Sequence, residues 1–365
     1  MRAVTICIIL RLEYSNIGAV VGWIDRIAEI EALEDAEFDA GLVAMMEANA
    51  DQSLARSIRF STPTFKEYES TELKGCGKNS FPAFSITAAG CALMCDHCNA
   101  KILEPMIPAT NPEMLDRKVR DLIMLQDLQG FLLSGGSNKR NEIRYERFYP
   151  VIEGLKRDHP ALQIAIHTAL TDEAGARRME SAGVDTAMMD VIGAQETIRE
   201  VYHLDRSVDD FEATLAALTA TRMNISPHIV IGLHYGRLLG EKNALDMIAR
   251  YPVEALVLVV IMPFYANPGT FVTPSTSDVG HIFLEARKRL PDKSVLLGCA
   301  RPPGMHKRVT DAYAVMAGLD GIAFPADGAV SVSQLIGRPT VQEHACCSIK
   351  LGGASLERVK TTCAA

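Results

Sequence analysis

Three cysteines lie close together in the chain and are the residues best suited to carry chemistry. Cys91, Cys95 and Cys98 are separated by three and then two residues. Thiolates are the soft ligands that iron–sulfur clusters require, and a short loop lets three of them reach one cluster. A four-iron cluster has four corners, so three cysteines leave one iron free to bind another molecule. The spacing therefore predicts a cluster with an open iron as the reactive centre.

A regular alternation of strands and helices surrounds this loop. Short apolar segments alternate with helical patterns, and each is the length of a strand. The predicted strands cover residues 81–87, 130–134, 162–168, 185–191, 225–233, 255–262, 295–300 and 321–325. The run from Thr110 to Glu113, with Pro112 near the helix start, predicts a capping box for the first helix. Eight such strand–helix units predict an α/β fold, a closed parallel (β/α)8 barrel of the TIM type.

The predicted barrel has an extension at each end. Residues 1–57 are acidic and helical in pattern, and we expect an N-terminal helical extension there. The barrel itself is expected over residues 58–338. Residues 339–365 form a C-terminal tail that is expected to lie outside the barrel and that carries Cys346 and Cys347.

Composition limits the classes of function. The chain has 365 residues, of which 48% are hydrophobic and 22% charged, with a net charge of −8. A negative net charge argues against a nucleic-acid surface, and no apolar run is long enough to span a membrane. We find no secretion signal and expect a cytoplasmic protein. Nine cysteines, an odd number, then indicate metal binding or catalysis rather than disulfides.

The cysteine motif after the first predicted strand resembles that of the radical S-adenosylmethionine (radical SAM) superfamily. The resemblance implies a four-iron, four-sulfur (4Fe-4S) cluster whose open iron binds S-adenosylmethionine. It also implies reductive formation of a 5′-deoxyadenosyl radical, with electrons from a low-potential donor such as ferredoxin or flavodoxin. An unactivated C–H bond is too weak an acid for a general base, so a cofactor has to supply the radical.

From about residue 80 to 325 the pattern most resembles biotin synthase and its relatives. The resemblance assigns cofactor contacts to six residues: His97 against the adenine, Gly135 and Gly136 at the methionyl amine with Ser137 in place of the usual acidic residue, Asp190 at the ribose and Arg206 at the carboxylate. Arg301 resembles an arginine near a second cluster. No catalytic residue is predicted beyond the cluster ligands.

The chain departs from biotin synthase in its other cysteines. That enzyme carries cysteines for a sulfur-donating two-iron cluster on barrel strands, whereas the third, fourth and fifth predicted strands here have none. Four cysteines elsewhere are candidates for an auxiliary 4Fe-4S cluster: Cys76, Cys299, Cys346 and Cys347. The alternative reading is that these are unrelated buried thiols.

A narrower resemblance covers residues 60–348. It rests on Tyr202–Asp205, on 232–236, on 298–302 and on the Cys346–Cys347 pair. These segments resemble subunits of the two-protein, archaeal-type lipoyl synthase, in which two radical enzymes insert sulfur into an octanoyl chain. The resemblance implies a sister radical SAM subunit as partner and an octanoylated carrier protein as substrate. Sulfur insertion needs a sulfur donor, which an auxiliary cluster can provide.

Two other functions stay open from the sequence. One is a radical SAM enzyme that rearranges or methylates its substrate without inserting sulfur. The other is a non-catalytic iron–sulfur protein that carries electrons or senses redox state, which cleavage of S-adenosylmethionine would exclude. His167, His228 and His234 lie on or just after predicted strands, where a barrel builds its active face, and are equally expected to touch substrate or to be core residues.

Overall fold

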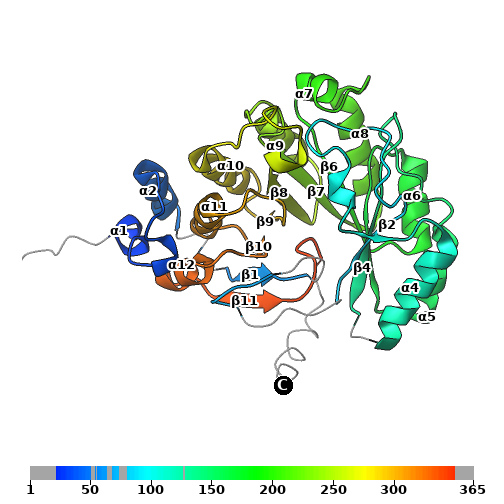
Figure 1. The fold of residues 1–365 in the computed structure, drawn as a ribbon, viewed down its shortest axis with the longest axis horizontal. Helices are drawn as coiled ribbons and strands as arrows, with labels where there is room; N and C mark the ends of the chain where they lie inside the picture. Colours follow the sequence, from blue (N-terminus) through cyan, green and yellow to red (C-terminus); the bar gives the residue numbers. More distant parts are fainter. Residues whose placement is uncertain are drawn as a thin grey trace, which may run out of the picture.

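The computed structural model shows a curled sheet of eleven parallel strands with helices along its outer face (Figure 1). The structure describes residues 22–50, 54, 56–63, 68–73, 80–125 and 128–349. The strands are β1 (Ile58–Ser61), β2 (Ala83–Ser85), β3 (Ile107–Pro108), β4 (Gly130–Ser134), β5 (Gln163–His167), β6 (Thr186–Asp190), β7 (Asn224–Ile231), β8 (Ala255–Val260), β9 (Ser294–Leu297), β10 (Gly321–Ala323) and β11 (Thr340–Glu343).

The helices follow most strands, as expected for β/α units. They are α1 (Trp23–Ile27), α2 (Ala40–Ala48), α4 (Pro112–Leu125), α5 (Tyr149–Asp158), α6 (Glu173–Ala182), α7 (Gln195–Glu200), α8 (Val208–Thr219), α9 (Glu241–Ala249), α10 (Thr276–Arg289), α11 (Met305–Met316) and α12 (Ala329–Leu335). Three 3₁₀ turns are η1 (Glu31–Leu33), η2 (Lys101–Leu103) and η3 (Pro263–Tyr265).

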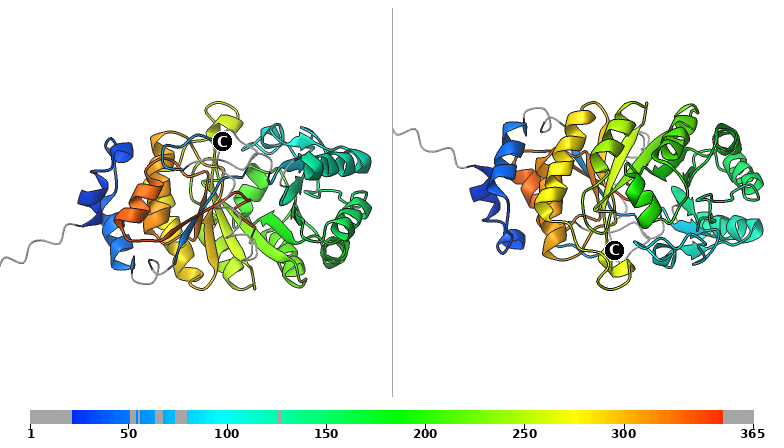
Figure 2. Two further views of the ribbon diagram at one scale, coloured as in Figure 1. Left: turned by 90° about the horizontal axis from the view of Figure 1, so that it is seen from below. Right: turned by 90° about the horizontal axis from the view of Figure 1, so that it is seen from above.

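The strand order is β11-β1-β10-β9-β8-β7-β6-β5-β4-β2-β3. All eight predicted strands are found: they are β2 and the seven strands from β4 to β10. The TIM-type fold class is confirmed. The barrel is not closed in the described part of the chain, because β3 and β11 form its two edges and β1 does not pair with β2. The views of Figure 2 show the sheet curling into a half-barrel.

The helix α4 begins one residue later than the predicted capping box. Asn111, not Thr110, is the cap, since its Oδ1 accepts a hydrogen bond of 2.8 Å from the backbone N–H of Met114. Pro112 then occupies the first helical position, where its missing N–H costs nothing.

The N-terminal helices pack on the barrel rather than standing apart. Residues 1–21 lie outside the described part, but α1 contacts α12, and α2 contacts α10 and α11 (Figure 1). The Asp39 side chain caps α2 by accepting from the N–H of Leu42 at 3.0 Å, and its own N–H donates to the Tyr313 hydroxyl at 2.7 Å. These contacts fix the extension against α11.

The C-terminal tail differs from the expectation that it lies outside the barrel. Residues 340–343 form β11, which pairs in parallel with β1 from Ile58 to Ser61. Arg59 on β1 donates to the Cys347 carbonyl at 2.8 Å. The residues after β11 are thereby directed to the inside of the sheet.

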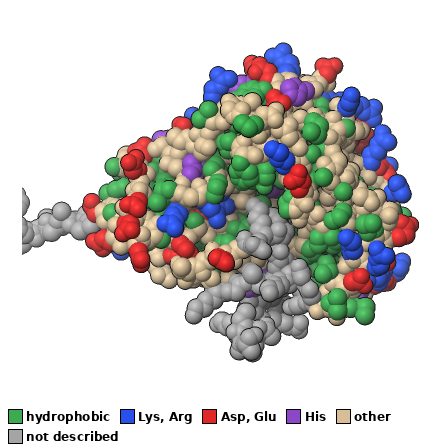
Figure 3. Space-filling model, viewed as in Figure 1, with side chains coloured by type: hydrophobic (Ala, Val, Ile, Leu, Met, Phe, Trp, Pro, Cys, Tyr) green, Lys and Arg blue, Asp and Glu red, His purple; other side chains and the backbone are tan. Residues whose placement is uncertain are grey.

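No helix among the described residues is both long and apolar enough to cross a membrane. On the face drawn in Figure 3, Lys and Arg side chains are interspersed with Asp and Glu.

Arg301 has a structural role, and its expected place near a second cluster stays a prediction. It is buried and donates to both oxygens of Asp311 at 2.6 and 2.8 Å. Its other N–H groups donate to the carbonyls of Gly298, Ala323 and Phe324. All five guanidinium hydrogens are used, so the side chain joins the ends of β9 and β10 to α11 and has no donor left for a ligand.

We predict that Arg301→Met lowers the free energy of unfolding by about 3–5 kcal/mol, because it leaves the Asp311 carboxylate buried without its partner. Urea denaturation under anaerobic conditions measures the loss. The control Arg177→Met removes the exposed pair with Glu173 and leaves the unfolding free energy nearly unchanged. A loss for Arg301→Met no larger than for the control would contradict the structural role.

Candidate functional site

A cavity of about 320 Å³ lies inside the half-barrel, against the ends of its strands. The loop after β2, the ends of β4 to β9 and the C-terminal tail all contribute to its wall. The described cysteines all line it: Cys91, Cys95, Cys98, Cys299, Cys346 and Cys347. Five of the six residues expected to contact the cofactor also line it: His97, Gly135, Gly136, Ser137 and Asp190. Cys76 lies outside the described residues.

The cysteine loop is held in an unusual backbone conformation by its neighbours. Met94, between two of the cysteines, has a φ of 48°, in the left-handed region that L-residues rarely adopt. The N–H of Ala92 donates to the carbonyl of Ser137 at 2.9 Å, and the N–H of Asp96 donates to that of Val201 at 3.0 Å. The loop is thus tied to the segments after β4 and α7, which fixes how its thiols face the cavity.

Asp96 anchors the loop, and sequence reasoning missed it. Its Oδ1 lies 2.7 Å from Nε2 of His203, and its Oδ2 accepts from the Tyr235 hydroxyl at 3.0 Å. The partners are 107 and 139 residues away in the sequence, so no local pattern identifies them.

The thiols of Cys95 and Cys98 are close enough to share a proton. A hydrogen bond from Cys95 lowers the pKa of Cys98 to about 4, with a further contribution from His97. The same contact, together with burial, raises the pKa of Cys95. Cluster ligands have to be thiolates, and the lowered pKa of Cys98 favours that form.

His97 packs on Tyr202, with ring centroids 5.1 Å apart and an angle of 31° between the rings. Burial lowers the pKa of His97, but its hydrogen bond to Cys98 and the charges of Cys98 and Asp190 outweigh burial, and the net shift is upward. Nδ1 of His97 and the Tyr202 hydroxyl are buried without a hydrogen-bond partner among the described residues. Buried polar atoms beside the cysteine loop that lack partners fit a site built for a bound group.

The glycines after β4 are required by the cysteine loop itself. A Cβ on Gly136 would lie 2.0 Å from the carbonyl oxygen of Gly90 and 2.6 Å from Cα of Cys91. A Cβ on Gly135 would lie 2.7 Å from a side-chain carbon of Ile86. Only glycine permits this approach of the two segments. The expected contact with a methionyl amine stays a prediction.

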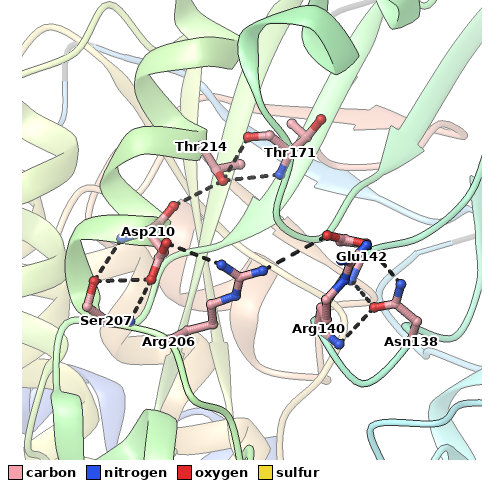
Figure 4. A network of polar contacts seen from close by, with 8 residues as sticks. All are labelled: Asn138, Arg140, Glu142, Thr171, Arg206, Ser207, Asp210 and Thr214. Carbon is pink, nitrogen blue, oxygen red and sulfur yellow. Dashed lines mark hydrogen bonds and ion pairs between the residues drawn. The ribbon is translucent and has the colours of Figure 1, made fainter.

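Asp190 and Arg206 differ in their placement. Asp190 ends β6 and lines the cavity. Arg206 is not among the described residues that line it; instead it lies 3.7 Å from Asp210 and 4.0 Å from Glu142 (Figure 4). Two carboxylates therefore already attract the guanidinium, and its expected role at a cofactor carboxylate stays a prediction.

The tail cysteines lie on the inner side of the sheet. Cys346 packs in a cluster with Ala165 and Met188, and Cys347 in a cluster with Val257 and Leu296. A hydrogen bond from Cys347 lowers the pKa of Cys346, while the same bond and burial raise that of Cys347. These two thiols and Cys299 line the same cavity as the cysteine loop.

No three His, Cys, Asp or Glu side chains in the described ranges converge closely enough to hold a single metal ion. A four-iron cluster is larger than an ion, and thiols that bind its separate corners stand further apart than the ligands of one ion. Three cavity-lining thiols, one of them with a lowered pKa, together with the unpartnered polar atoms of His97 and Tyr202, fit such a cluster.

Comparison with known proteins supports the fold. No protein-family model matches the chain, and no curated protein matches it. Among solved structures, it is similar to HydG, a maturase of the FeFe-hydrogenase, with 12% identity, a TM-score of 0.56, and coverage of 79% of this chain and 62% of that one. It is also similar to methylornithine synthase (PylB), with 12% identity and a TM-score of 0.53. The match covers 88% of this chain and 97% of the PylB chain.

HydG from Carboxydothermus hydrogenoformans gives 16% identity and a TM-score of 0.53, with 83% of this chain and 67% of that one covered. The chain thus spans about two thirds of the HydG chains and nearly all of the PylB chain. At these identities the likeness establishes the fold alone. That fold is the TIM-type β/α architecture that the alternation of strands and helices led us to expect, here open as a half-barrel.

We predict that Gly136→Ala prevents cluster assembly on the loop, because its methyl group would displace Cys91. Iron per chain after anaerobic reconstitution should fall by about four, the content of one cluster. The control Gly154→Ala, on α5, places its methyl group no closer than 3.7 Å to the Arg157 side chain and should keep the full iron content. Full iron content in Gly136→Ala, with unchanged circular dichroism, would contradict the assignment.

Proposed function

We propose that this chain is a radical SAM enzyme that inserts sulfur into an octanoyl chain attached to a lysine of a carrier protein, acting with a sister subunit. One observation carries the proposal: two separate groups of cysteines line a single cavity. The first is the loop group, Cys91, Cys95 and Cys98. The second is the tail group, Cys299, Cys346 and Cys347.

The loop group supports the radical part of the proposal. Its three thiols are the ligand set for a 4Fe-4S cluster with an open iron. When bound, the cluster and S-adenosylmethionine supply a 5′-deoxyadenosyl radical that abstracts hydrogen from an unactivated carbon. His97 and Asp190 lie in the wall, where they would contact the adenine and the ribose.

The tail group supports the sulfur-inserting part. Cys299 follows β9, and Cys346 and Cys347 follow β11, so distant segments converge on one region of the wall. An auxiliary 4Fe-4S cluster held there would be a source of sulfur for a carbon radical formed in the same cavity. Unrelated buried thiols have no reason to meet at the cavity that the loop group also faces.

The wall of the shared cavity suits an aliphatic chain. It is mostly apolar and includes Leu132, Met188, Val230, Val257 and Val259. Burial of an alkyl chain against such side chains contributes about 0.8 kcal/mol for each CH₂ group. Apolar contacts along its whole length would therefore hold an octanoyl chain, with the radical source and the sulfur donor both within reach. The low-potential electron donor, ferredoxin or flavodoxin, is part of the same proposal.

The test is mass spectrometry of an octanoyl-lysyl peptide after incubation with the reconstituted, reduced full chain and S-adenosylmethionine, with and without the sister subunit. We predict a mass increase of one sulfur atom for each insertion, together with 5′-deoxyadenosine. Cys98→Ala should abolish both products. The double variant Cys346→Ala/Cys347→Ala should still form 5′-deoxyadenosine but should not add sulfur.

Three results would contradict the proposal in different ways. If the Cys346→Ala/Cys347→Ala variant inserted sulfur at the same rate as the unmodified chain, the tail group would have no part in the reaction. Formation of 5′-deoxyadenosine with a rearranged or methylated product would favour a radical enzyme without sulfur insertion. Absence of 5′-deoxyadenosine under reducing conditions would favour an iron–sulfur protein that carries electrons.

A further inference from the structure

Three polar side chains interrupt the apolar wall of the cavity. His167 ends β5, Asp190 ends β6, and His228 lies on β7, where it is the register partner of Asp190. Nε2 of His167 lies 3.8 Å from Oδ1 of Asp190. The rings of His167 and His228 meet edge to face, with centroids 5.3 Å apart. All three side chains line the cavity.

The backbone fixes which nitrogen of His228 carries its proton. Nδ1 lies 3.0 Å from the carbonyl oxygen of Ser226. A carbonyl can only accept, so Nδ1 must donate. Burial, with a smaller effect of His167, lowers the pKa of His228 to about 4 although Asp190 opposes the shift. The ring is therefore neutral at neutral pH, and its Nε2 is a hydrogen-bond acceptor.

This acceptor has no donor among the described residues. The hydrogen bond to Ser226 is the only one that His228 makes there. Its neighbours on the wall are apolar: Met188 on β6, Val230 two residues further along β7, and Val257, its partner on β8. The charged and titratable groups beside it are His167 and Asp190. A neutral acceptor without a donor favours a ligand that brings an N–H.

We propose that His228 accepts a hydrogen bond from the amide N–H of an otherwise aliphatic substrate, with His167 positioned beside it by Asp190. The inference rests on the proposed function and deepens it, because an octanoyl group on lysine carries one amide N–H at the end of its alkyl chain. It also assigns a specificity. An ester or thioester of the same chain brings no N–H, and a free fatty acid brings a negative charge that Asp190 repels.

The experiment compares two probes, of which the second carries a methyl group in place of this N–H. N-methyloctanamide has one, and N,N-dimethyloctanamide has none. Their dissociation constants are measured by anaerobic calorimetry on the reconstituted full chain with S-adenosylmethionine and without reductant, so that no turnover occurs. We expect the probe with the N–H to bind about tenfold more tightly. In His228→Leu the ratio should fall to about one.

Two further variants keep the result interpretable. His228→Gln, whose side-chain carbonyl is also an acceptor, should restore part of the preference. His281→Leu, which replaces an exposed histidine on α10, should keep all of it. Equal binding of the two probes by the unmodified chain would overturn the proposal. Tighter binding of octylamine than of N-methyloctanamide would also overturn it, because the group of His167, Asp190 and His228 would then be a site for a cation. A His228→Leu variant that loses affinity for S-adenosylmethionine but keeps the N–H preference would place His228 in the cofactor site instead.

The outcome is separable from that of the proposed function. An N–H preference without any sulfurated product would retain the amide site and reject sulfur insertion. Sulfurated product without an N–H preference would retain sulfur insertion and reject the amide site.

Discussion

The parallel pairing of β11 with β1 is the interaction on which the site depends. β1 lies before the first of the predicted strands and β11 close to the end of the described chain, and together they extend the sheet beyond β10. The pairing directs Cys346 and Cys347 into the half-barrel, where the Cys347 carbonyl accepts from Arg59. Without it, the tail cysteines would have no fixed relation to the loop that carries Cys91, Cys95 and Cys98.

Another part of the cavity wall depends on a second constraint, the attachment of the cysteine loop. Its strained backbone is compensated by hydrogen bonds to the segments after β4 and α7, and by the side chain of Asp96 between His203 and Tyr235. Gly136 allows the loop to approach β4 closely. A loop pinned in this way presents its thiols with little conformational entropy left to lose when a cluster binds.

Local features, such as apolar strands and the spacing of the cysteines, could be predicted from the sequence. Contacts between distant segments could not. The strands β4 to β10 were predictable because each is a short apolar run bounded by polar or turn residues. β1 and β11 were not, since four residues of mixed polarity carry no periodicity and their pairing joins segments about 280 residues apart. The three loop cysteines were identified from spacing alone. Asp96 was missed because its partners are distant in the sequence. The structural role of Arg301 was missed because a resemblance does not reveal that Asp311 and three carbonyls use all of its donors.

We propose one cavity built around two groups of thiols, each of which would hold a cluster. Iron content per chain after anaerobic reconstitution tests it most directly. We predict about eight irons for the unmodified chain. Replacing Cys91, Cys95 and Cys98 by alanine should leave about four, and so should replacing Cys299, Cys346 and Cys347. About four irons in the unmodified chain, unchanged when the tail group is removed, would contradict it.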